Sequence, residues 1–146
     1  MTGMSEPLIL HVPLASDLGR LGLELRRAVF IVEQNVSEEV ERDEYDATAT
    51  HVVALEDGTV AGVLRIVFLP EHAKIGRVAV ARSTRGRGLA TRMMRFAMDL
   101  ARAKGETKFY LTAQTDKLEL YEKLGFRAFG EEFEDGGMPH LGMKNY

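Results

Sequence analysis

The sequence predicts an α/β (α+β) domain in which helices flank one mixed, mostly antiparallel sheet of about six or seven strands. Short runs rich in valine and leucine are typical of strands, and one segment near residues 88–103 has apolar residues at helical spacing. Turn residues separate these segments, and no repeat or linker interrupts them. We therefore expect a single domain over residues 1–146, with residues 1–6 as a flexible tail.

Two composition features narrow the class of protein. The chain has 146 residues, of which 45% are hydrophobic and 28% charged, as in an ordinary globular domain with a core of its own. It contains no cysteine, which excludes a disulfide framework, a thiolate zinc site and a cysteine nucleophile. No apolar run approaches the roughly 20 residues that span a bilayer, and residues 1–7 lack the features of a signal peptide. We therefore predict a cytoplasmic protein with no membrane partner.

The amino-terminal half predicts a strand, a helix and a hairpin in that order. Apolar residues alternate over residues 8–13, which indicates a strand. Ser16-Asp17 provides a helix cap, after which Leu18, Leu21, Leu25 and Val29 recur at helical spacing. The acidic segment 36–48 has no clear period and predicts a loop or a short helical turn. Strands at 51–55 and 59–69 flank Asp57-Gly58, a strong signal for a tight hairpin.

The carboxy-terminal half predicts one long helix among further strands. Residues 74–81 are expected to form a strand. From Gly88 onward an amphipathic helix places apolar residues at i, i+4, i+7 and i+11, namely Leu89, Met93, Phe96 and Leu100. The remaining expected elements are strands at 109–113 and 126–133, a short helix at 117–124, and a last edge strand at 139–144.

Charge is distributed unevenly along the chain. The net charge is −3, from 19 basic and 22 acidic residues. Between Lys74 and Lys104, however, nine basic residues stand against Asp99 alone, a local charge of +8. Residues 33–46 hold seven carboxylates against Arg42, and we expect most of those at 38–46 to lie on a solvated face. The basic segment therefore indicates a binding site for an anion.

A glycine-rich turn within the basic segment is the strongest local motif. Residues 78–91 run from a strand through Gly86-Arg87-Gly88 directly into the amphipathic helix. The first turn of a helix has unpaired N–H groups and a partial positive charge, and glycine lets a phosphate approach the backbone. Arg85 and Arg87 are expected to add charge-assisted bonds. The alternative is a glycine-rich loop with a solvated basic rim.

Three familiar phosphate-binding classes fit this turn poorly. The P-loop pattern Gly-x-x-x-x-Gly-Lys-Ser/Thr is absent. A dinucleotide site would need a third glycine where the sequence has Thr91, and an acidic residue at the end of a following parallel strand. Nucleic acid is also disfavoured, because the protein is acidic overall and no aromatic residues interleave with the arginines.

Taken together, these motifs resemble the GNAT superfamily of acyl-CoA N-acyltransferases. Arg85-x-x-Gly88-x-Ala90 after a Val-Ala-Val strand is similar to the pyrophosphate-binding signature of that superfamily. The resemblance extends over nearly the whole chain and is strongest to the branch typified by YjcF and ElaA. The segments that carry it are residues 26–36, Asp43-Glu44, His51, Ala113-Gln114-Thr115, residues 120–126 and residues 137–141.

This resemblance implies a GNAT fold with a V-shaped cleft that holds acyl-CoA between the strands near Val80 and Ala113. Acetyl-CoA is the implied co-substrate. The backbone of Val78 and Val80 would bind the pantetheine arm, and residues 85–91 would wrap the pyrophosphate. The residues expected to bind the cofactor are Val78, Ala79, Val80, Arg85, Gly86, Arg87, Gly88, Leu89, Ala90, Thr91, Gln114 and Tyr121.

The resemblance also implies catalytic roles. The Val80 N–H would stabilise negative charge on the thioester oxygen, and Tyr121 would protonate the departing CoA thiolate. Tyr121 has an alternative role in core packing beside Phe126. An amine acceptor arrives protonated and needs a base. Candidates from the acceptor side are Glu33, Asp43, Glu44, His51 and His140. The resemblance favours a cleft-facing role for Glu33, and the ordinary pKa of histidine suits His140 as a base near neutral pH. His140 has the alternative of a structural bond to a backbone group.

The predicted function is an acetyl-CoA-dependent N-acetyltransferase. It would act by direct attack in a ternary complex on a primary amine of a small molecule or of a protein. The rival hypothesis is a non-catalytic acyl-CoA-binding module that senses the cofactor or regulates a partner. Because the four histidines are scattered without ligand spacing, no metal is predicted. The edge strand expected at residues 139–144 suggests a possible homodimer.

Overall fold

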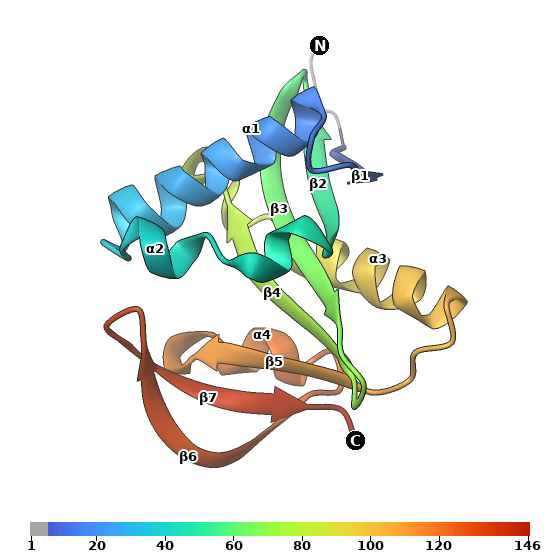
Figure 1. Cartoon of the computed structure of the whole chain (residues 1–146), viewed down its shortest axis with the longest axis vertical. Coiled ribbons are helices and arrows are strands. Elements are labelled where there is room, and N and C mark those ends of the chain that lie inside the picture. The colour runs from blue at the N-terminus through green and yellow to red at the C-terminus, as the bar shows by residue number, and fades with distance from the viewer. Residues whose placement is uncertain (1–5) are drawn as a thin grey trace.

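Seven strands form one open sheet in the computed structural model, which describes residues 6–146 (Figure 1). The strand order is β1-β2-β3-β4-β5-β7-β6, and all neighbours are antiparallel except β4 and β5. This confirms the mixed, mostly antiparallel sheet. The strands are β1 (Leu8–Val12), β2 (Thr50–Glu56), β3 (Thr59–Phe68), β4 (Ala73–Val80), β5 (Phe109–Gln114), β6 (Arg127–Asp135) and β7 (Met138–Lys144). The tail expected at residues 1–6 lies, apart from Glu6, outside the described residues.

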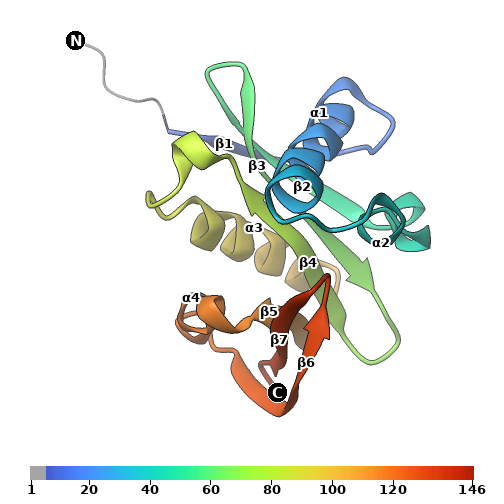
Figure 2. The ribbon, with the colours of Figure 1, turned by 90° about the vertical axis from the view of Figure 1, so that its left-hand side faces the viewer.

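Helices cover both faces of the sheet (Figures 1 and 2). The long helix α3 packs on one face in a core with α4, whereas α1 packs on the other face over β2, β3 and β4. The helices are α1 (Asp17–Arg26), the π-helix η1 (Arg27–Glu33), α2 (Glu38–Glu41), η2 (Glu44–Ala47), η3 (Arg82–Thr84), α3 (Leu89–Ala103), η4 (Thr115–Lys117) and α4 (Leu118–Glu122). Strand β3 lies between two cores, which explains its almost continuous apolar sequence.

Helix α3 confirms the predicted amphipathic helix, but some of the residues on its buried face differ from those predicted. Phe96 and Leu100 are only half-buried against the core, because small and flexible residues sit deeper. The fully packed positions are Leu89, Met93, Met94, Ala97, Met98 and Ala101. The two alanines allow a close approach of the helix to the sheet, and the methionines fill the irregular space between them.

The first helix begins where its cap predicts and then changes its hydrogen-bond pattern. The Ser16 hydroxyl accepts from Gly19 N at 3.0 Å, which makes Ser16 the N-cap. The α-helix ends at Arg26, and the chain continues as the π-helix η1 to Glu33, with Gln34 N donating to Val29 O. Such π segments are rare and often occur at functional sites. Here the segment delivers Glu33 and Gln34 to the region between β4 and β5.

The hairpin between β2 and β3 turns at Asp57-Gly58, as predicted. Their φ angles are 50° and 76°, the left-handed pair that a two-residue hairpin turn requires. The acidic segment forms the two short helices α2 and η2, in keeping with the expected helical turn. The predicted short helix at residues 117–124 corresponds to α4 and the 3₁₀ turn before it.

Strands β4 and β5 separate soon after they meet. They pair only at Ala73 with Phe109 and at Lys74 with Tyr110. Beyond that point the register between β3 and β4 shifts, and Arg77 has a φ of 53°. A bulge of this kind bends a strand and redirects its side chains. Among residues 6–146, the rest of β4 therefore has no strand on its β5 side, and this opening is the V-shaped cleft.

The carboxy-terminal strand is not the edge of the sheet, which corrects the prediction for residues 139–144. Strand β7 lies between β5 and β6, so the outer strand is β6. Gly136 and Gly137 have positive φ angles and turn the chain back after β6, which inserts β7 beside β5. Burial agrees with this order, because every residue of β6 is exposed whereas His140, Gly142 and Met143 of β7 are buried.

Candidate functional site

A cleft of about 680 Å³ occupies the space between the separated strands. Its walls come from β4, β5, the glycine-rich turn, η1 and the start of β7. The structure brings nearly all predicted site residues to this one place. Those that line the cleft are Glu33, Val78, Ala79, Val80, Arg85, Gly86, Gly88, Leu89, Ala90, Thr91, Gln114, Tyr121 and His140. Of the residues predicted to bind the cofactor, Arg87 is the one that does not line the cleft.

The free edge of β4 presents backbone groups to the cleft. Ala81 N donates to Ala61 O on β3 at 2.8 Å, and antiparallel bonding to one neighbour alternates along a strand. The N–H and C=O groups of Ala79 therefore point toward β3. Those of Val78 and Val80 point the opposite way, toward the side from which β5 has separated. The Val80 carbonyl accepts from Arg85 Nε at 3.0 Å.

The glycine-rich turn ends in a helix whose first N–H groups have no side-chain cap. Gly86 and Gly88 have φ angles of 80° and 78°, a conformation that favours glycine, and no atom lies within 4 Å of a Cβ placed on either. The first backbone bond of α3 runs from Arg92 N to Gly88 O. The N–H groups of Leu89, Ala90 and Thr91 come earlier in the helix, without carbonyls one turn back. A helix start of this kind favours an anion, and this one lies at the cleft wall.

Both arginines of the turn are engaged by carboxylates. Arg85 donates to both oxygens of Glu33, at 2.7 and 2.9 Å, and thereby joins the turn to η1. Arg87 makes a similar pair with Glu56 of β2, at 3.1 and 2.5 Å, outside the cleft. The hydrogen bonds from Arg85 lower the pKa of Glu33, so Glu33 is a weaker base than an ordinary glutamate. The backbone, rather than a pair of free arginines, therefore dominates the anion site.

Tyr121 packs in the core and also reaches the cleft. Its ring packs edge-on against Phe126 in the core, with centroids 6.4 Å apart, and the residue is only 9% exposed. It also lines the cleft, and its hydroxyl makes no hydrogen bond with any residue from 6 to 146. Burial raises the pKa of Tyr121 to about 12. The hydroxyl therefore stays protonated at neutral pH and can donate a proton.

His140 is oriented by its own strand. Its Nδ1 lies 2.8 Å from Met138 O, and its ring stacks on Phe133. Because a carbonyl only accepts, the Nδ1 atom carries the hydrogen, and Nε2 keeps its lone pair in the neutral ring. The backbone bond foreseen as an alternative is thus present, and it leaves Nε2 able to accept a proton. His140 pairs in register with Gln114 on β5.

Gln114 closes the other side of the cleft. Its Nε2 donates to Gln34 Oε1 at 3.1 Å, so the end of η1 is tied to β5 as well as to the turn. Glu33 and Gln34 are neighbours in the chain, yet they contact opposite arms of the V. The π-helix therefore spans the cleft on the acceptor side.

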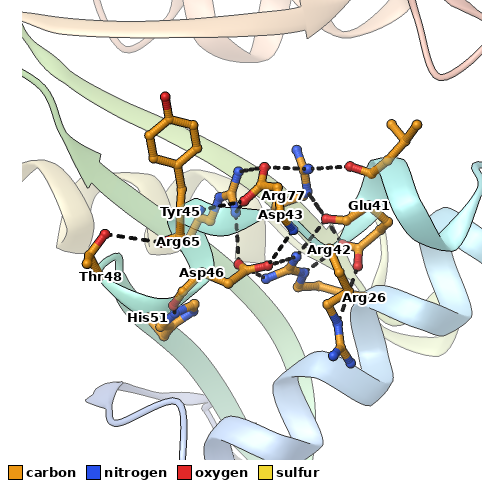
Figure 3. Close-up of polar contacts among 11 residues, drawn as sticks. Arg26, Glu41, Arg42, Asp43, Tyr45, Asp46, Thr48, His51, Arg65 and Arg77 are labelled. Atoms are coloured by element: carbon orange, nitrogen blue, oxygen red, sulfur yellow. Dashed lines mark hydrogen bonds and ion pairs between the residues drawn. The ribbon is translucent and has the colours of Figure 1, made fainter.

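The acidic segment is only partly the solvated face expected for residues 38–46: Glu38, Glu39 and Glu44 are exposed, whereas Glu41 and Asp46 point into the protein. Glu41 and Asp46 are buried, at 2% and 7% exposure, around the guanidinium of Arg26, which is 1% exposed (Figure 3). Arg26 donates to Glu41 at 2.7 Å and to Asp46 at 2.7 and 3.1 Å. Arg65 on β3 joins the network through Asp46 at 2.8 Å. Burial of so many charges requires such pairing.

Two proposed acceptor-side bases belong to this network and not to the cleft. Asp43 accepts from Arg65 at 2.6 and 2.8 Å. His51 is buried, lies 2.8 Å from Asp46 O, and has a pKa lowered by burial. Neither residue lines the cleft, and Glu44 is exposed outside it. Asp43 and His51 therefore belong to the structural network of buried charges.

Sequence reasoning missed the arginines that organise this network, although one signal was present. Arg65 is the only charged residue in the apolar strand β3, and a charge in such a strand needs a buried partner. Lys74 and Arg77 on β4 also line the cleft, as does Gln34. Among residues 6–146, no group of histidines and carboxylates has the arrangement of a metal site. No helix in that range is long and apolar enough to cross a membrane.

Known proteins are similar to this chain in sequence and in fold. Residues 22–126 match the model of the Acetyltransferase (GNAT) family. The uncharacterised N-acetyltransferase YjcF of Bacillus subtilis is 35% identical over 120 residues, which cover 82% of this chain and 86% of the relative. The crystal structure of Escherichia coli ElaA superposes with a TM-score of 0.85 at 30% identity, covering 97% of this chain and 100% of ElaA.

A structure of an acyl-CoA N-acyltransferase from Pseudomonas aeruginosa gives a similar result. It has a TM-score of 0.84 and 31% identity, and it covers 96% of this chain and 99% of its own. The matched region includes the strand, turn and helix that build the cleft. The chain belongs to the GNAT family, in its ElaA and YjcF branch, and is an acyl-CoA N-acyltransferase.

Proposed function

We propose that the protein transfers an acetyl group from acetyl-CoA to a primary amine by direct attack while both substrates are bound. The observation that carries this proposal is the separation of β4 from β5 beside the uncapped first turn of α3. The cleft thus offers a strand edge for an extended pantetheine arm and an anion site for a pyrophosphate at its end. The acceptor is a small molecule or an exposed protein amine.

The glycine-rich end of the cleft offers open space and backbone donors to a diphosphate. Open space at the two glycines allows close approach to the backbone, and the N–H groups of Leu89, Ala90 and Thr91 are available to donate. Gly86 and the Arg85 backbone complete the turn. Arg87, which is paired with Glu56, contributes at most its main chain.

The strand edge supplies the electrostatic part of catalysis. The Val80 N–H faces the side from which acyl-CoA would approach, and in our proposal it donates to the thioester oxygen. A donor fixed by the sheet needs no reorganisation as negative charge develops on that oxygen, and such donors commonly contribute about 3 kcal/mol. The backbone groups of Val78 lie farther along the same edge, on the side of the thioester away from the pyrophosphate.

Two side chains move protons at the other end of the cleft. His140 Nε2 takes a proton from the acceptor ammonium, directly or through water, which frees the lone pair for attack. As the C–N bond forms and the C–S bond breaks, the Tyr121 hydroxyl protonates the departing thiolate. Glu33 was the other candidate base, but its pairing with Arg85 and its lowered pKa favour a role in holding the turn.

The first test is calorimetric titration of the purified protein with acetyl-CoA, beside free CoA, ATP and NAD. We expect binding of the CoA species alone. Release of CoA in the presence of a panel of primary amines then tests turnover. Tight binding without turnover on any amine would favour a non-catalytic module, and no CoA binding would overturn the proposal.

A further inference from the structure

Arg77 has a backbone conformation that is unusual inside a strand. Among residues 6–146, the residues other than glycine that have a positive φ are Asn35, Asp57 and Arg77. Asparagine and aspartate tolerate this conformation, and both of these lie outside the strands. Arg77, with a φ of 53°, lies within β4, where a bulge with a left-handed residue normally takes a glycine. An arginine at this position therefore needs support from its surroundings.

The bulge at Arg77 adds one residue to β4 relative to β3. Before the bulge, Gly76 pairs with Arg65 of β3. After it, Ala79 pairs with Val63, so that two residues of β4 lie opposite a single residue of β3. A regular ladder continued from Gly76 would instead place the residue before Ala79 opposite Val63.

This extra residue decides which backbone groups of β4 face the cleft. In an antiparallel ladder, the N–H and C=O groups of successive residues point alternately toward the two sides of the strand. One inserted residue reverses the alternation beyond the bulge, so Val78 and Val80 point toward the cleft and Ala79 toward β3. Without the bulge, the groups of Ala79 would face the cleft. The Val80 N–H that we propose as a donor is thus available on the cleft side because of the bulge.

The side chain of Arg77 is held by three acceptors that lie outside the sheet (Figure 3). Its Nε donates to Glu41 O at 3.0 Å, and its Nη2 donates to Val40 O at 3.0 Å and to Asp43 Oδ2 at 3.2 Å. Val40 and Glu41 end the short helix α2, where carbonyls lack helical partners. Only 23% of the Arg77 side chain is exposed. The arginine therefore ties the bulge to α2 and to Asp43.

The groups that hold Arg77 are themselves fixed. Arg26 of α1 donates to the carbonyl of Glu41 at 3.0 Å and to its carboxylate at 2.7 Å. Asp43 accepts from Arg65 of β3 at 2.6 and 2.8 Å. The planar guanidinium of Arg77 thus connects the bulge to a network that includes the first helix and the neighbouring strand.

We infer that Arg77 is a positioning residue for the acyl-transfer step. Its guanidinium, bound to α2 and Asp43, holds the left-handed backbone of the bulge and so directs the Val80 N–H into the cleft. Arg77 acts through the strand and not on the substrate. This inference rests on the donor role that the proposed function gives to Val80. It also gives the buried charges a part in the reaction, because they hold the catalytic edge of β4.

Two substitutions of Arg77 separate its backbone conformation from its charge. R77A removes the anchor and leaves a residue that disfavours a positive φ, and we expect kcat to fall by about 10- to 100-fold, as for a slight misplacement of a catalytic group. R77G removes the same anchor but introduces the residue that favours this backbone, so part of kcat should return. The affinity for free CoA should change little in both variants, because the diphosphate site lies at the start of α3.

R27Q is the matched control for the kinetic comparison. Arg27 donates to Glu38 of the same helix α2 at 3.0 Å, but it is exposed and lies outside the cleft. Its loss should leave kcat unchanged. A wild-type kcat in R77A or R77G, or equal losses in the two variants, would overturn the inference. If R77A does not fold, the loss in R77G is measured against the wild type together with the spectra described next.

Two spectroscopic measurements report the positioning without turnover. Infrared spectra of bound acetyl-CoA, isotope-labelled at the thioester carbonyl, show a hydrogen bond to that oxygen as a lower C=O stretching frequency. In R77A we expect this frequency to move toward that of free acetyl-CoA, and in R77G to move less. Amide hydrogen exchange reports the alternation of β4: the Ala79 N–H should be protected in the wild type, less protected in R77A, and protected again in part in R77G.

These measurements distinguish failure of this inference from failure of the proposed function. If no amine is acetylated, the proposed reaction fails, while the infrared and exchange measurements still test Arg77. A frequency equal to that of free acetyl-CoA in the wild type would overturn the donor role of Val80 and this inference with it. A lowered frequency that R77A and R77G both keep, with unchanged exchange at Ala79, would overturn the inference alone.

Discussion

Arg85 of the glycine-rich turn holds Glu33 of the π-helix through two hydrogen bonds of 2.7 and 2.9 Å across the mouth of the cleft. The pair joins residues 52 positions apart in the chain. It connects the proposed cofactor side of the site to the acceptor side. The same guanidinium lies at the turn where a pyrophosphate would bind, so Glu33 and the pyrophosphate compete for it.

The first prediction concerns this competition. Glu33→Gln removes the charge that occupies Arg85, and we expect CoA to bind up to about fivefold more tightly, the scale of an exposed ion pair. The rate of acetyl transfer should change little, because we propose His140, and not Glu33, as the base. Calorimetry and steady-state kinetics measure the two quantities.

Glu56→Gln is the matched control for that variant. It breaks the comparable pair between Glu56 and Arg87, which lies outside the cleft, and CoA affinity should not change. A large loss of kcat in Glu33→Gln, with unchanged affinity, would instead identify Glu33 as the base.

The second prediction concerns the proton donor. Tyr121→Phe should lower kcat by roughly 10²- to 10⁴-fold and leave the affinity for CoA unchanged, because it removes only the hydroxyl. Since the pKa of Tyr121 is raised to about 12, its ionisation should not limit the rate between pH 6 and 9. Tyr45→Phe, at an exposed tyrosine, is the control. Unchanged turnover would assign Tyr121 to core packing alone.

The third prediction concerns the base. His140→Gln keeps a polar side chain but removes the basic nitrogen, so kcat should fall by about 10²-fold. The KM for acetyl-CoA should stay nearly constant, because His140 lies on the acceptor side. His11→Gln changes an exposed histidine outside the cleft and should have no effect. Assays of CoA release measure kcat and KM for each variant. A normal kcat in His140→Gln would exclude the role of His140 as the base.

The fourth prediction concerns the buried ion pairs. Asp46→Asn leaves the guanidinium groups of Arg26 and Arg65 partly uncompensated, and loss of one partner in a buried pair costs about 3–5 kcal/mol. Urea unfolding at pH 7 should show a decrease of that order in the free energy of unfolding. Asp99→Asn, which affects an exposed pair with Arg102, should change it by less than about 0.5 kcal/mol. Similar decreases in the free energy of unfolding for the two variants would show that the buried network stabilises the fold no more than an exposed ion pair does.

The same network predicts a loss of stability in acid. Although burial opposes it, bonds from Arg26 and Arg65 hold the pKa of Asp46 far below its usual range, and a hydrogen bond from Arg65 lowers that of Asp43. The unfolded chain therefore binds more protons once the pH falls below about 4, and stability decreases. Burial of His51 lowers its pKa and adds a loss that begins below about pH 6.5.

Urea midpoints at pH 7, 5 and 3.5 measure this dependence. We expect a steady fall toward low pH, with a smaller change between pH 5 and 3.5 in Asp46→Asn, which lacks the titrating carboxylate. A constant midpoint over this range would show that the carboxylates are not held in the charged form by their partners.

The elements that follow local rules were predictable from the sequence. The spacing of apolar residues and the flanking glycines predicted α3, and Asp57-Gly58 predicted the hairpin turn that its left-handed backbone forms. The glycine-rich turn predicted an anion site because glycine conformation and an uncapped helix start depend on neighbours in the chain. Family resemblance then joined these parts into a cleft.

Other features depend on approaches between distant segments, which local patterns do not encode. The order of β7 and β6 follows from which face each strand buries after the chain turns back. The sequence presented Glu41 and Asp46 as part of an acidic surface, because their partners Arg26 and Arg65 lie 15 to 20 residues away.

The sequence by itself thus determined the element types, the glycine-rich turn and the family. Only the tertiary structure decided which charges are paired and which remain free. Arg85 and Arg87 look equivalent in the chain, yet one faces Glu33 at the cleft and the other Glu56 outside it. Lys74, on the same basic segment, has no ion pair with any of residues 6–146, and its ammonium group lies 5.8 Å from the centroid of the Tyr110 ring. Pairing is decided by distance and burial in three dimensions, since a charge leaves water only where a partner replaces its hydration.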